Sequence, residues 1–443
     1  MRRMAPSAPQ RMAPSAPGDS IQVLVVGGGM ITADLILPSL YHLQRLGRIG
    51  EITVCALGSA PLRVLAENPE IRAAFPRSSF TPQPPLSTPP EESRPEIAPE
   101  LVAQLPPRQV VFVAVPDQLH HGVVMGALRA DQHVLCVKPL VLSHEQAREI
   151  GEEARARGLF VGVEYHKRFD RRSLLARRDY RAGRFGEFMF GEARLIEPWS
   201  YRHSNFQNWF LPEATDPFAY VGCHYVDLVH FITGLRPVEV SLFGVRRRFP
   251  NGNEGFLWSL GCVRWENGAL LSVSNGLGYP DRAAGGNDQG LLMYCEGPDA
   301  SGMIRHDDHH RGVSYSYLEE MVPGGSHYNY VSPDFFRLVP WEGEGLRPVG
   351  YGYDSIEALV GTVQRVESAG AGLTAATARE ARRRALRAVD EAGIIATPVN
   401  SSVNELAMEA GRLSILNGGR PARIDYGGAE SASGGAAPRV WLP

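Results

Sequence analysis

The sequence predicts an α/β protein: a Rossmann-type, doubly wound parallel sheet, then an α+β domain with a large, open, mainly antiparallel sheet. Apolar strand-like runs alternate with helical patterns in the first part of the chain, as parallel sheets require. A glycine-rich turn follows the first run. Beyond residue 237, strand-like runs follow one another with turn residues between them. At 443 residues the chain suits two domains, which we place at 21–160 and 161–443.

The strands of the first domain are expected where short apolar runs occur, since central parallel strands are buried on both faces. They are Ile21–Val26, Ile52–Leu57, Val110–Val115, His133–Cys136 and Phe160–Val163. Helical patterns lie between most of them, at Ala33–Leu46, His121–Ala130 and His144–Arg157. Residues 76–107 contain ten prolines. We expect an extended surface insertion there, without regular helix or a central strand.

The second domain begins with a helical pattern and continues with strand-like runs. The helix is expected at Tyr220–Thr233. The strands are expected at Val238–Phe243, Phe256–Trp265, Ala269–Asn275 and Leu291–Glu296, and a last helix at Val403–Leu416.

The first twenty residues form a separate segment. Arg3–Pro9 recurs as Arg11–Pro17, rich in Pro, Ala and Ser. Such a segment buries too little apolar surface to offset the entropy of ordering it, so we expect residues 1–20 to be a disordered leader.

Composition narrows the class of partner. The net charge of −3 gives no electrostatic reason to expect nucleic acid or an anionic membrane. No apolar stretch approaches the roughly 18 residues of a membrane-spanning helix. Five scattered cysteines without a Cys-x-x-Cys spacing indicate reduced thiols, and a cytoplasmic protein is expected.

The glycine-rich turn suits a dinucleotide. Gly27 and Gly29 fit the first two positions of the dinucleotide-binding fingerprint, and Thr32 takes the third. Glycine lets the backbone turn sharply and lets a pyrophosphate approach the amino terminus of the helix that follows. The alternative is a plain strand–helix connector. We favour a cofactor site that includes these four residues, Gly27, Gly29, Met30 and Ile31.

The choice between NAD and NADP stays open. An Asp or Glu that binds the adenosine ribose usually ends the second strand, but Leu57 is followed by Gly58 without a carboxylate. Ser59 and Arg63 could receive a 2′-phosphate instead. Equally, Arg63 could be a solvated helix residue.

Lys138 is the strongest candidate for chemistry. It follows an apolar run, precedes Pro139, and lies at the carboxyl end of a strand, where parallel sheets bind their ligands. A lysine there can hydrogen-bond a reacting hydroxyl and stabilise developing alkoxide charge. The alternative is an exposed lysine in a loop.

Several motifs occur together in a recognisable order. They are Val113–His120, His133–Leu140, Val163–Asp170, Gly183–Glu187 and Gly222–Asp227. In this order they resemble the Gfo/Idh/MocA oxidoreductases, over roughly residues 21 to 275. The resemblance implies hydride transfer between NAD or NADP and a secondary alcohol or ketone of a sugar, polyol or glycoside. It also implies a homo-oligomer, either a dimer or a tetramer.

The resemblance assigns roles residue by residue. It implies that Lys138 and His224 form the pair that polarises the substrate oxygen and transfers its proton. Asp227, one helical turn from His224, could orient the imidazole or only balance a local charge. The resemblance also places Lys138, Val115, Pro116 and His120 at the cofactor.

Two residues depart from the family pattern. Val137 stands where a Glu usually precedes the lysine, and Tyr220 stands where an Asp is common four residues before the histidine. The catalytic set would then be Lys138, Tyr220 and His224. With neither carboxylate present, Lys138 is expected to be less neutralised than in relatives.

Candidate substrate residues come from two segments. Trp199–Phe210 is rich in aromatic and amide side chains, which suit a carbohydrate, although the same segment could simply pack between domains. From it we single out Arg202, Asn208 and Trp209. The resemblance adds His166 and Lys167.

A histidine-rich cluster is not expected to bind metal. His306-Asp307-Asp308-His309-His310 has no diagnostic ligand spacing, and a solvated surface turn is the better interpretation.

Two other functions stay open. Some relatives oxidise a sugar transiently to cleave a glycosidic bond without net redox change. A nicotinamide-binding regulator without catalysis is the third alternative, and the presence of both Lys138 and His224 argues against it.

Overall fold

The computed structural model describes residues 20–283, 285–298, 301–307, 315–322, 325–331, 334–427 and 437–443. Within 315–322 and 325–331 it describes the backbone alone. The predicted leader lies almost wholly outside the described residues. The predicted surface turn at 306–310 is described only as far as Asp307.

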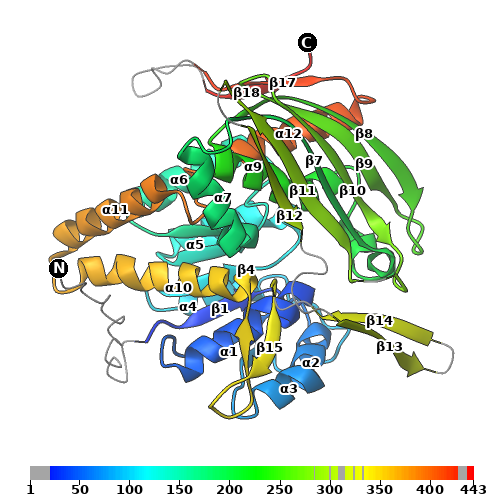
Figure 1. Ribbon diagram of the computed structural model, residues 1–443. Helices are drawn as coiled ribbons and strands as arrows, with labels where there is room; N and C mark the ends of the chain where they lie inside the picture. Colours follow the sequence, from blue (N-terminus) through cyan, green and yellow to red (C-terminus); the bar gives the residue numbers. More distant parts are fainter. Residues whose placement is uncertain are drawn as a thin grey trace, which may run out of the picture.

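The first sheet is a six-stranded parallel sheet (Figure 1). Its strands are β1 (Val23–Val26), β2 (Ile52–Cys55), β3 (Thr81–Gln83), β4 (Val110–Val113), β5 (His133–Val137) and β6 (Val161–Glu164). Their spatial order is β3-β2-β1-β4-β5-β6, with every neighbouring pair parallel. This order reverses between β1 and β4, and ligands bind outside the carboxyl ends of the strands at such a point. The predicted Rossmann-type fold is confirmed.

Helices cover both faces of this sheet because alternate strand residues point to opposite faces. One face packs on η1 (Thr32–Ile36), α1 (Leu37–Arg45), α2 (Ser59–Glu67) and α3 (Pro69–Ala74). The other packs on α4 (Ile97–Gln104), α5 (His120–Arg129) and α6 (His144–Arg157). A late segment of the chain, α10 (Tyr351–Gly370), completes the first face, where Leu359 contacts Gly162 of β6 closely enough to exclude a Cβ there.

The second sheet has eight strands in the order β12-β11-β7-β10-β9-β8-β17-β18. Its strands are β7 (Glu187–Pro198), β8 (Pro237–Arg248), β9 (Glu254–Trp265), β10 (Leu270–Tyr279), β11 (Asp288–Glu296), β12 (Ser301–Asp307), β17 (Ala422–Asp425) and β18 (Arg439–Trp441). Only the β7–β10 pair is parallel among those described, so the predicted large, mainly antiparallel sheet is confirmed.

The inner face of the second sheet shares one core with the α4–α6 side of the first. Between them lie η5 (Phe218–Gly222), α9 (Cys223–Thr233) and α12 (Val403–Leu416). The segment from β6 to β7 is folded as η3 (His166–Phe169) and α7 (Arg171–Arg181). The predicted helices at 220–233 and 403–416 are confirmed.

The outer face of the second sheet exposes large apolar side chains. They are Met189, Phe190, Phe243, Val245, Trp258, Leu260, Tyr294 and Met303. A wide apolar face of this kind suits contact with another protein surface, and the expected homo-oligomer stays a prediction. Among the described residues, no helix has the length and apolar character needed to cross a membrane.

The remaining elements are short or lie at the periphery. They are η2 (Asp117–Leu119), η4 (Trp199–His203), α8 (Phe206–Trp209), α11 (Ala375–Ala392), the hairpin β13 (Tyr315–Val322) with β14 (Gly325–Val331), and the hairpin β15 (Arg337–Pro340) with β16 (Leu346–Val349).

The prediction that residues 76–107 contain no regular helix is wrong. The segment holds the edge strand β3 and the helix α4. Pro82 is tolerated because β3 is an edge strand, and Pro99 because it lies in the first turn of α4, where a backbone N–H has no helical partner.

Candidate active site

The glycine turn lies at the point where the strand order reverses. Gly27 has a φ of +118°, and a Cβ there would be 2.0 Å from the carbonyl oxygen of Ala114, directly after β4. Only glycine fits this position. By contrast, a Cβ on Gly29 would meet nothing within 4 Å, so the space beside the turn is open.

The helix after this turn begins at Met30, which is exposed, and Ile31, which is half-buried. Thr32 Oγ1 donates a 2.6 Å hydrogen bond to the Gly27 carbonyl and holds the turn closed. The first N–H groups of a helix lack helical partners and suit a phosphate. The turn therefore fits a dinucleotide.

The two residues proposed for a 2′-phosphate have other partners. Ser59 is fully buried and its Oγ donates a 2.6 Å hydrogen bond to the carbonyl of Thr88. Arg63 donates from Nε to Leu86 O (2.7 Å) and from Nη2 to Thr88 O (2.6 Å). Both side chains hold the proline-rich segment against α2.

Lys138 follows β5 and reaches the second domain. Its Nζ donates a hydrogen bond to the carbonyl oxygen of Tyr220 and lies 4.2 Å from the centroid of the Tyr220 ring. The charge of Lys138 affects the pKa of two carboxyl groups, those of Asp117 and Glu197. Burial raises the pKa of Asp117 and of Glu197, and the nearby Lys138 ammonium opposes that rise in both.

His224 lies beside this lysine as a neutral imidazole. The side chain is 5% exposed and its Nδ1 has no hydrogen-bond partner in the described structure. Burial, together with the charges of Lys138, His166 and Lys167, lowers the pKa of His224 well below its usual value. A neutral ring with a free nitrogen can accept a proton.

His166 packs against His224 with ring centroids 4.7 Å apart. Its Nδ1 lies 2.9 Å from the buried Glu164 carboxylate, whose other oxygen accepts a 2.7 Å hydrogen bond from Ser355 Oγ on α10. A helix from the last quarter of the chain therefore fixes the orientation of the His166 ring.

A chain of side chains connects Lys167 to Glu197 across the site. Lys167 Nζ donates to Gln289 Oε1 (2.6 Å), Gln289 Nε2 to Asn287 Oδ1 (3.2 Å), and Asn287 Nδ2 to Glu197 Oε2 (3.3 Å). Burial raises the pKa of Glu197, against the Asn287 hydrogen bond and the charges of Lys138 and Lys167. The site thus contains two ammonium groups and a carboxyl group that retains its proton to higher pH than usual.

The Asp227 carboxylate is bound to Arg168 rather than to His224. Arg168 Nε and Nη2 donate to its two oxygens at 2.8 and 2.5 Å, and Asn404 Nδ2 donates at 2.7 Å. The ion pair is buried, with each side chain 1% exposed. Asp227 therefore ties α9 to η3 and α12, and makes no described hydrogen bond to the His224 ring.

His120, expected at the cofactor, is fully buried behind the site. Its Nδ1 lies 2.9 Å from Pro139 O and its Nε2 2.8 Å from Val115 O, so both nitrogens must donate and the ring carries a charge. Burial opposes that charge, but Cys136, Asp117 and the Val115 carbonyl raise the pKa of His120 to about 10. His120 joins the loops after β4 and β5, while Val115 and Pro116 remain half-buried at the edge of the sheet.

Of the three residues chosen from the aromatic-rich segment, only Trp209 borders the site. Trp209 packs 5.8 Å from the Tyr220 ring and borders the site. Arg202 donates to the carbonyl of Leu277 and lies over Trp258, on the outer side of the sheet. Asn208 is exposed and accepts a 3.1 Å hydrogen bond from Asn251.

Glu197 was not identified from the sequence. Nor was it predicted that Asp117 and Glu197 lie within electrostatic reach of Lys138. Both lie close enough for the charge of Lys138 to act on their pKa values, although neither occupies one of the two family positions. The expectation that Lys138 is less neutralised than in relatives stays a prediction. A signal existed in the register of β7, where Ala193 and Leu195 point inward and Glu197 continues that face.

A second signal lies in composition. The 443-residue sequence contains 45 lysines and arginines, of which two are lysines, Lys138 and Lys167. Both lie in this site, while every other cationic side chain of these two types is arginine.

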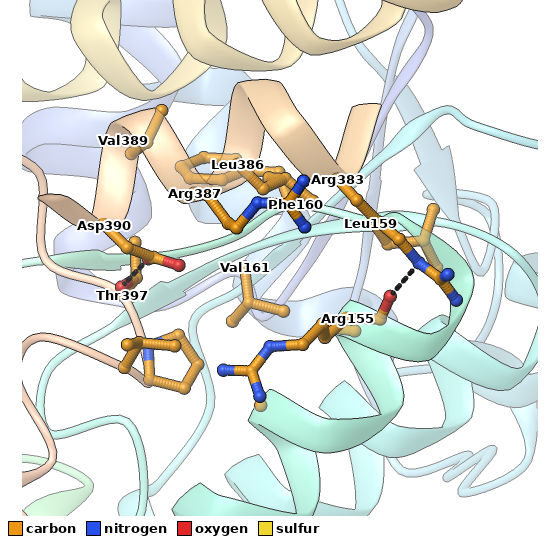
Figure 2. A pocket seen from close by; sticks show the side chains of 14 residues that line it. Arg155, Leu159, Phe160, Val161, Arg383, Leu386, Arg387, Val389, Asp390 and Thr397 are labelled. Carbon is orange, nitrogen blue, oxygen red and sulfur yellow. Dashed lines mark hydrogen bonds between the residues drawn. The ribbon is translucent and has the colours of Figure 1, made fainter. Parts of the chain in front are cut away.

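A small cavity elsewhere in the molecule is a different feature (Figure 2). It has a volume of about 40 Å³ and is lined by α6, α11 and the amino end of β6, including Arg155, Arg383 and Val161. That edge of the parallel sheet is opposite to Lys138. The volume suits a few water molecules rather than a sugar or nucleotide. Among the described residues, no group of three or more His, Cys, Asp or Glu side chains is arranged to hold a metal ion.

Two family models match the chain. One, described as "Oxidoreductase family, NAD-binding Rossmann fold", matches residues 21–165. The other, described as "GFO/IDH/MocA C-terminal domain", matches residues 174–296.

Curated relatives include 1,5-anhydro-D-fructose reductase of Ensifer adhaerens, 30% identical over 175 residues, which are 39% of this chain and 51% of that protein. D-glucoside 3-dehydrogenase of Escherichia coli is 28% identical over 135 residues, 29% of this chain and 37% of that protein. The chain thus matches about half or less of the length of these relatives.

Solved structures share the fold over nearly the whole chain. GenD2 from gentamicin A biosynthesis, in complex with NAD, has a TM-score of 0.63 at 17% identity and covers 94% of this chain and 99% of its own. Scyllo-inositol dehydrogenase from Lactobacillus casei, with NAD(H) and scyllo-inositol, has a TM-score of 0.52 at 16% identity, with 86% and 99% covered.

Proposed function

Because the chain belongs to the Gfo/Idh/MocA oxidoreductase family, we propose that it transfers a hydride between NAD or NADP and a sugar, polyol or glycoside. The reacting group is a secondary alcohol or the corresponding ketone. One observation carries this proposal: Lys138, His166, Lys167 and His224 lie together at the carboxyl edge of the parallel sheet whose first strand ends in the glycine turn.

The cofactor would be held by the turn at Gly27 and Gly29, the helix start at Met30 and Ile31, and the loop at Val115 and Pro116. Hydride acceptance or donation is the chemistry that a bound nicotinamide supplies. Side chains of the protein polarise the substrate oxygen, transfer its proton and bind the other hydroxyls.

Lys138 positions and polarises the reacting oxygen. Its Nζ, which donates to the Tyr220 carbonyl in the free protein, would donate to the substrate hydroxyl and stabilise the alkoxide character that develops as hydride leaves carbon. His224 accepts the hydroxyl proton, because its lowered pKa keeps the ring neutral. In the reduction direction the same proton returns to the carbonyl oxygen.

The neighbouring polar groups bind the remaining hydroxyls. Glu197, Asn287, Gln289 and Lys167 form a continuous row of donors and acceptors, and Trp209 with Tyr220 offers aromatic surface. This mixture suits a polyhydroxylated ring, whose hydroxyls need partners and whose C–H faces pack on aromatic rings.

A turnover assay tests the function. Purified protein is mixed with NAD or NADP and a panel of glycosides and polyols, and the absorbance of reduced nicotinamide is followed. Steady formation of reduced cofactor with at least one substrate is expected. Release of aglycone without net reduction would contradict the dehydrogenase and indicate the redox-neutral glycosidase. Cofactor binding with neither reaction would indicate the regulator.

Replacing Glu197 by Gln should lower kcat/KM by about 10- to 100-fold, because a neutral amide with one acceptor oxygen replaces the carboxylate proposed to accept from a substrate hydroxyl. The pH profile should change as well. Burial raises the pKa of Glu197 above the ordinary glutamate value of 4.5, so the wild-type rate should fall as pH drops through a pKa above 4.5. The Glu197→Gln protein cannot titrate there and should lose this acid limb.

Glu192→Gln is the matched control. Glu192 lies on the same strand but is exposed, so both rate and profile should match wild type. If Glu197→Gln retains the wild-type rate and the wild-type acid limb, Glu197 has no role in substrate binding.

A further inference from the structure

We infer that the protein selects NAD over NADP, and that the proline-rich segment rather than a carboxylate at the end of β2 makes the selection. The inference rests on the proposed function, since it concerns the cofactor of that same site.

The carboxyl end of β2 is where this fold recognises the 2′ position of the adenosine ribose. NAD carries a hydroxyl there and NADP a phosphate. A phosphate needs donors or cations, whereas a hydroxyl can also donate its own hydrogen to an acceptor. The groups next to Gly58 therefore decide which cofactor is accepted.

Three of the hydrogen bonds that Ser59 and Arg63 could offer a phosphate are made to the main chain instead. The Ser59 hydroxyl and both donating nitrogens of Arg63 are bound to main-chain oxygens of Leu86 and Thr88, at 2.6 to 2.7 Å. Freeing Arg63 for a phosphate would cost the Leu86 carbonyl its hydrogen bond from Nε and the Thr88 carbonyl one of its two.

The same segment places acceptors beside the β2 end. Arg94 N–H donates a 2.7 Å hydrogen bond to Leu57 O, which anchors the segment against the residue after the strand. A Cβ on Gly58 would lie 3.1 Å from the carbonyl oxygen of Glu92 and 3.6 Å from that of Pro90. Main-chain oxygens therefore line the approach to this position.

The charge of this segment acts in the same direction. Glu91 and Glu92 are both exposed, in a turn closed by a hydrogen bond from Glu92 N–H to Pro89 O. The nearest cation along the chain, Arg94, is paired with Glu100 at 3.2 Å. The charge of the two exposed carboxylates thus disfavours a 2′-phosphate, while the two carbonyl oxygens can accept a hydrogen bond from a 2′-hydroxyl.

Binding measurements on the full-length protein test the inference without turnover. Titration of NADH and NADPH, followed by calorimetry and by nicotinamide fluorescence, should give a dissociation constant at least about tenfold lower for NADH. Glu91→Gln/Glu92→Gln should tighten NADPH by at least about threefold, because two repelling charges are removed. NADH binding should not change.

Two variants serve as comparison. Glu152→Gln neutralises an exposed glutamate on α6, paired with Arg148, and should change neither dissociation constant. Arg63→Met should not weaken NADPH relative to NADH. If Arg63→Met weakens NADPH alone, or if wild type binds NADPH as tightly as NADH, the selection is not as inferred.

The same titrations separate this inference from the proposed function. Selective NADH binding without turnover of any substrate would leave the inference standing and overturn the function. Turnover with NADP as efficient as with NAD would support the proposed function and overturn the inference of NAD selection. Binding of neither cofactor would overturn both.

Discussion

Replacing Lys138 by Met should lower kcat by about 10²- to 10⁴-fold, the range measured for a positioned acid–base or polarising group. Methionine keeps the apolar stem but removes the ammonium that donates to the Tyr220 carbonyl and that we expect to polarise the substrate oxygen. KM should change less than kcat, because the lost interaction is made chiefly in the transition state. Steady-state kinetics, with NADH binding as a check of folding, measure both.

Lys167→Met is the matched comparison, since it removes the other lysine of the chain. Its Nζ bonds Gln289, in the row of groups proposed for the non-reacting hydroxyls, so KM should rise more than kcat falls. A Lys138→Met protein with near-normal kcat would show that Lys138 is not at the reacting centre. So would a Lys138→Met protein whose KM rises more than its kcat falls, as expected for Lys167→Met.

Replacing Arg168 by Met should lower the free energy of unfolding by about 3–5 kcal/mol, because it leaves the buried Asp227 carboxylate without its cation. Arg168 and Asp227 are each 1% exposed and joined by two hydrogen bonds. Chemical denaturation followed by circular dichroism gives the change. Activity should fall too, because this pair fixes η3, with His166, against α9, with His224.

Two controls accompany this variant. Arg148→Met breaks an exposed pair with Glu152 and should cost at most about 1 kcal/mol. The double variant Arg168→Met/Asp227→Leu removes both charges and should be more stable than Arg168→Met alone. If Arg168→Met costs no more than Arg148→Met, the buried pair does not hold the site together.

The fold could be predicted from the sequence because its determinants are local. Five apolar runs identified five strands of the first sheet, and the last helix was predicted with its observed bounds, Val403–Leu416. The helices of residues 351–370 and 375–392, and the strand β7, were not predicted. Where α10 packs is not a local property, since it covers a sheet whose strands lie about 190 or more residues earlier.

The site could be predicted only as far as contiguous motifs reach. Lys138, His166, Lys167 and His224 each stand in a motif, and the structure brings all four together. Arg202 and Asn208 were chosen by residue type alone, and their partners could not be read from the sequence. Glu197, where the charge of Lys138 opposes the rise in pKa, lies 59 positions later in the sequence, so no local pattern contains both residues.

Because the sequence contains lysine at positions 138 and 167 alone, a label that reacts with lysine would report on these two side chains. Reductive methylation with ¹³C-formaldehyde would place isotopic labels on two side chains and on the α-amino group, whose lower pKa identifies its signal. Both remaining resonances would then come from the candidate active site. The spectrum of a 48.5 kDa protein would then contain two lysine signals. Following them against pH would give the ionisation of Lys138, the proposed catalytic lysine, and of Lys167, proposed to bind substrate, with cofactor and with substrate.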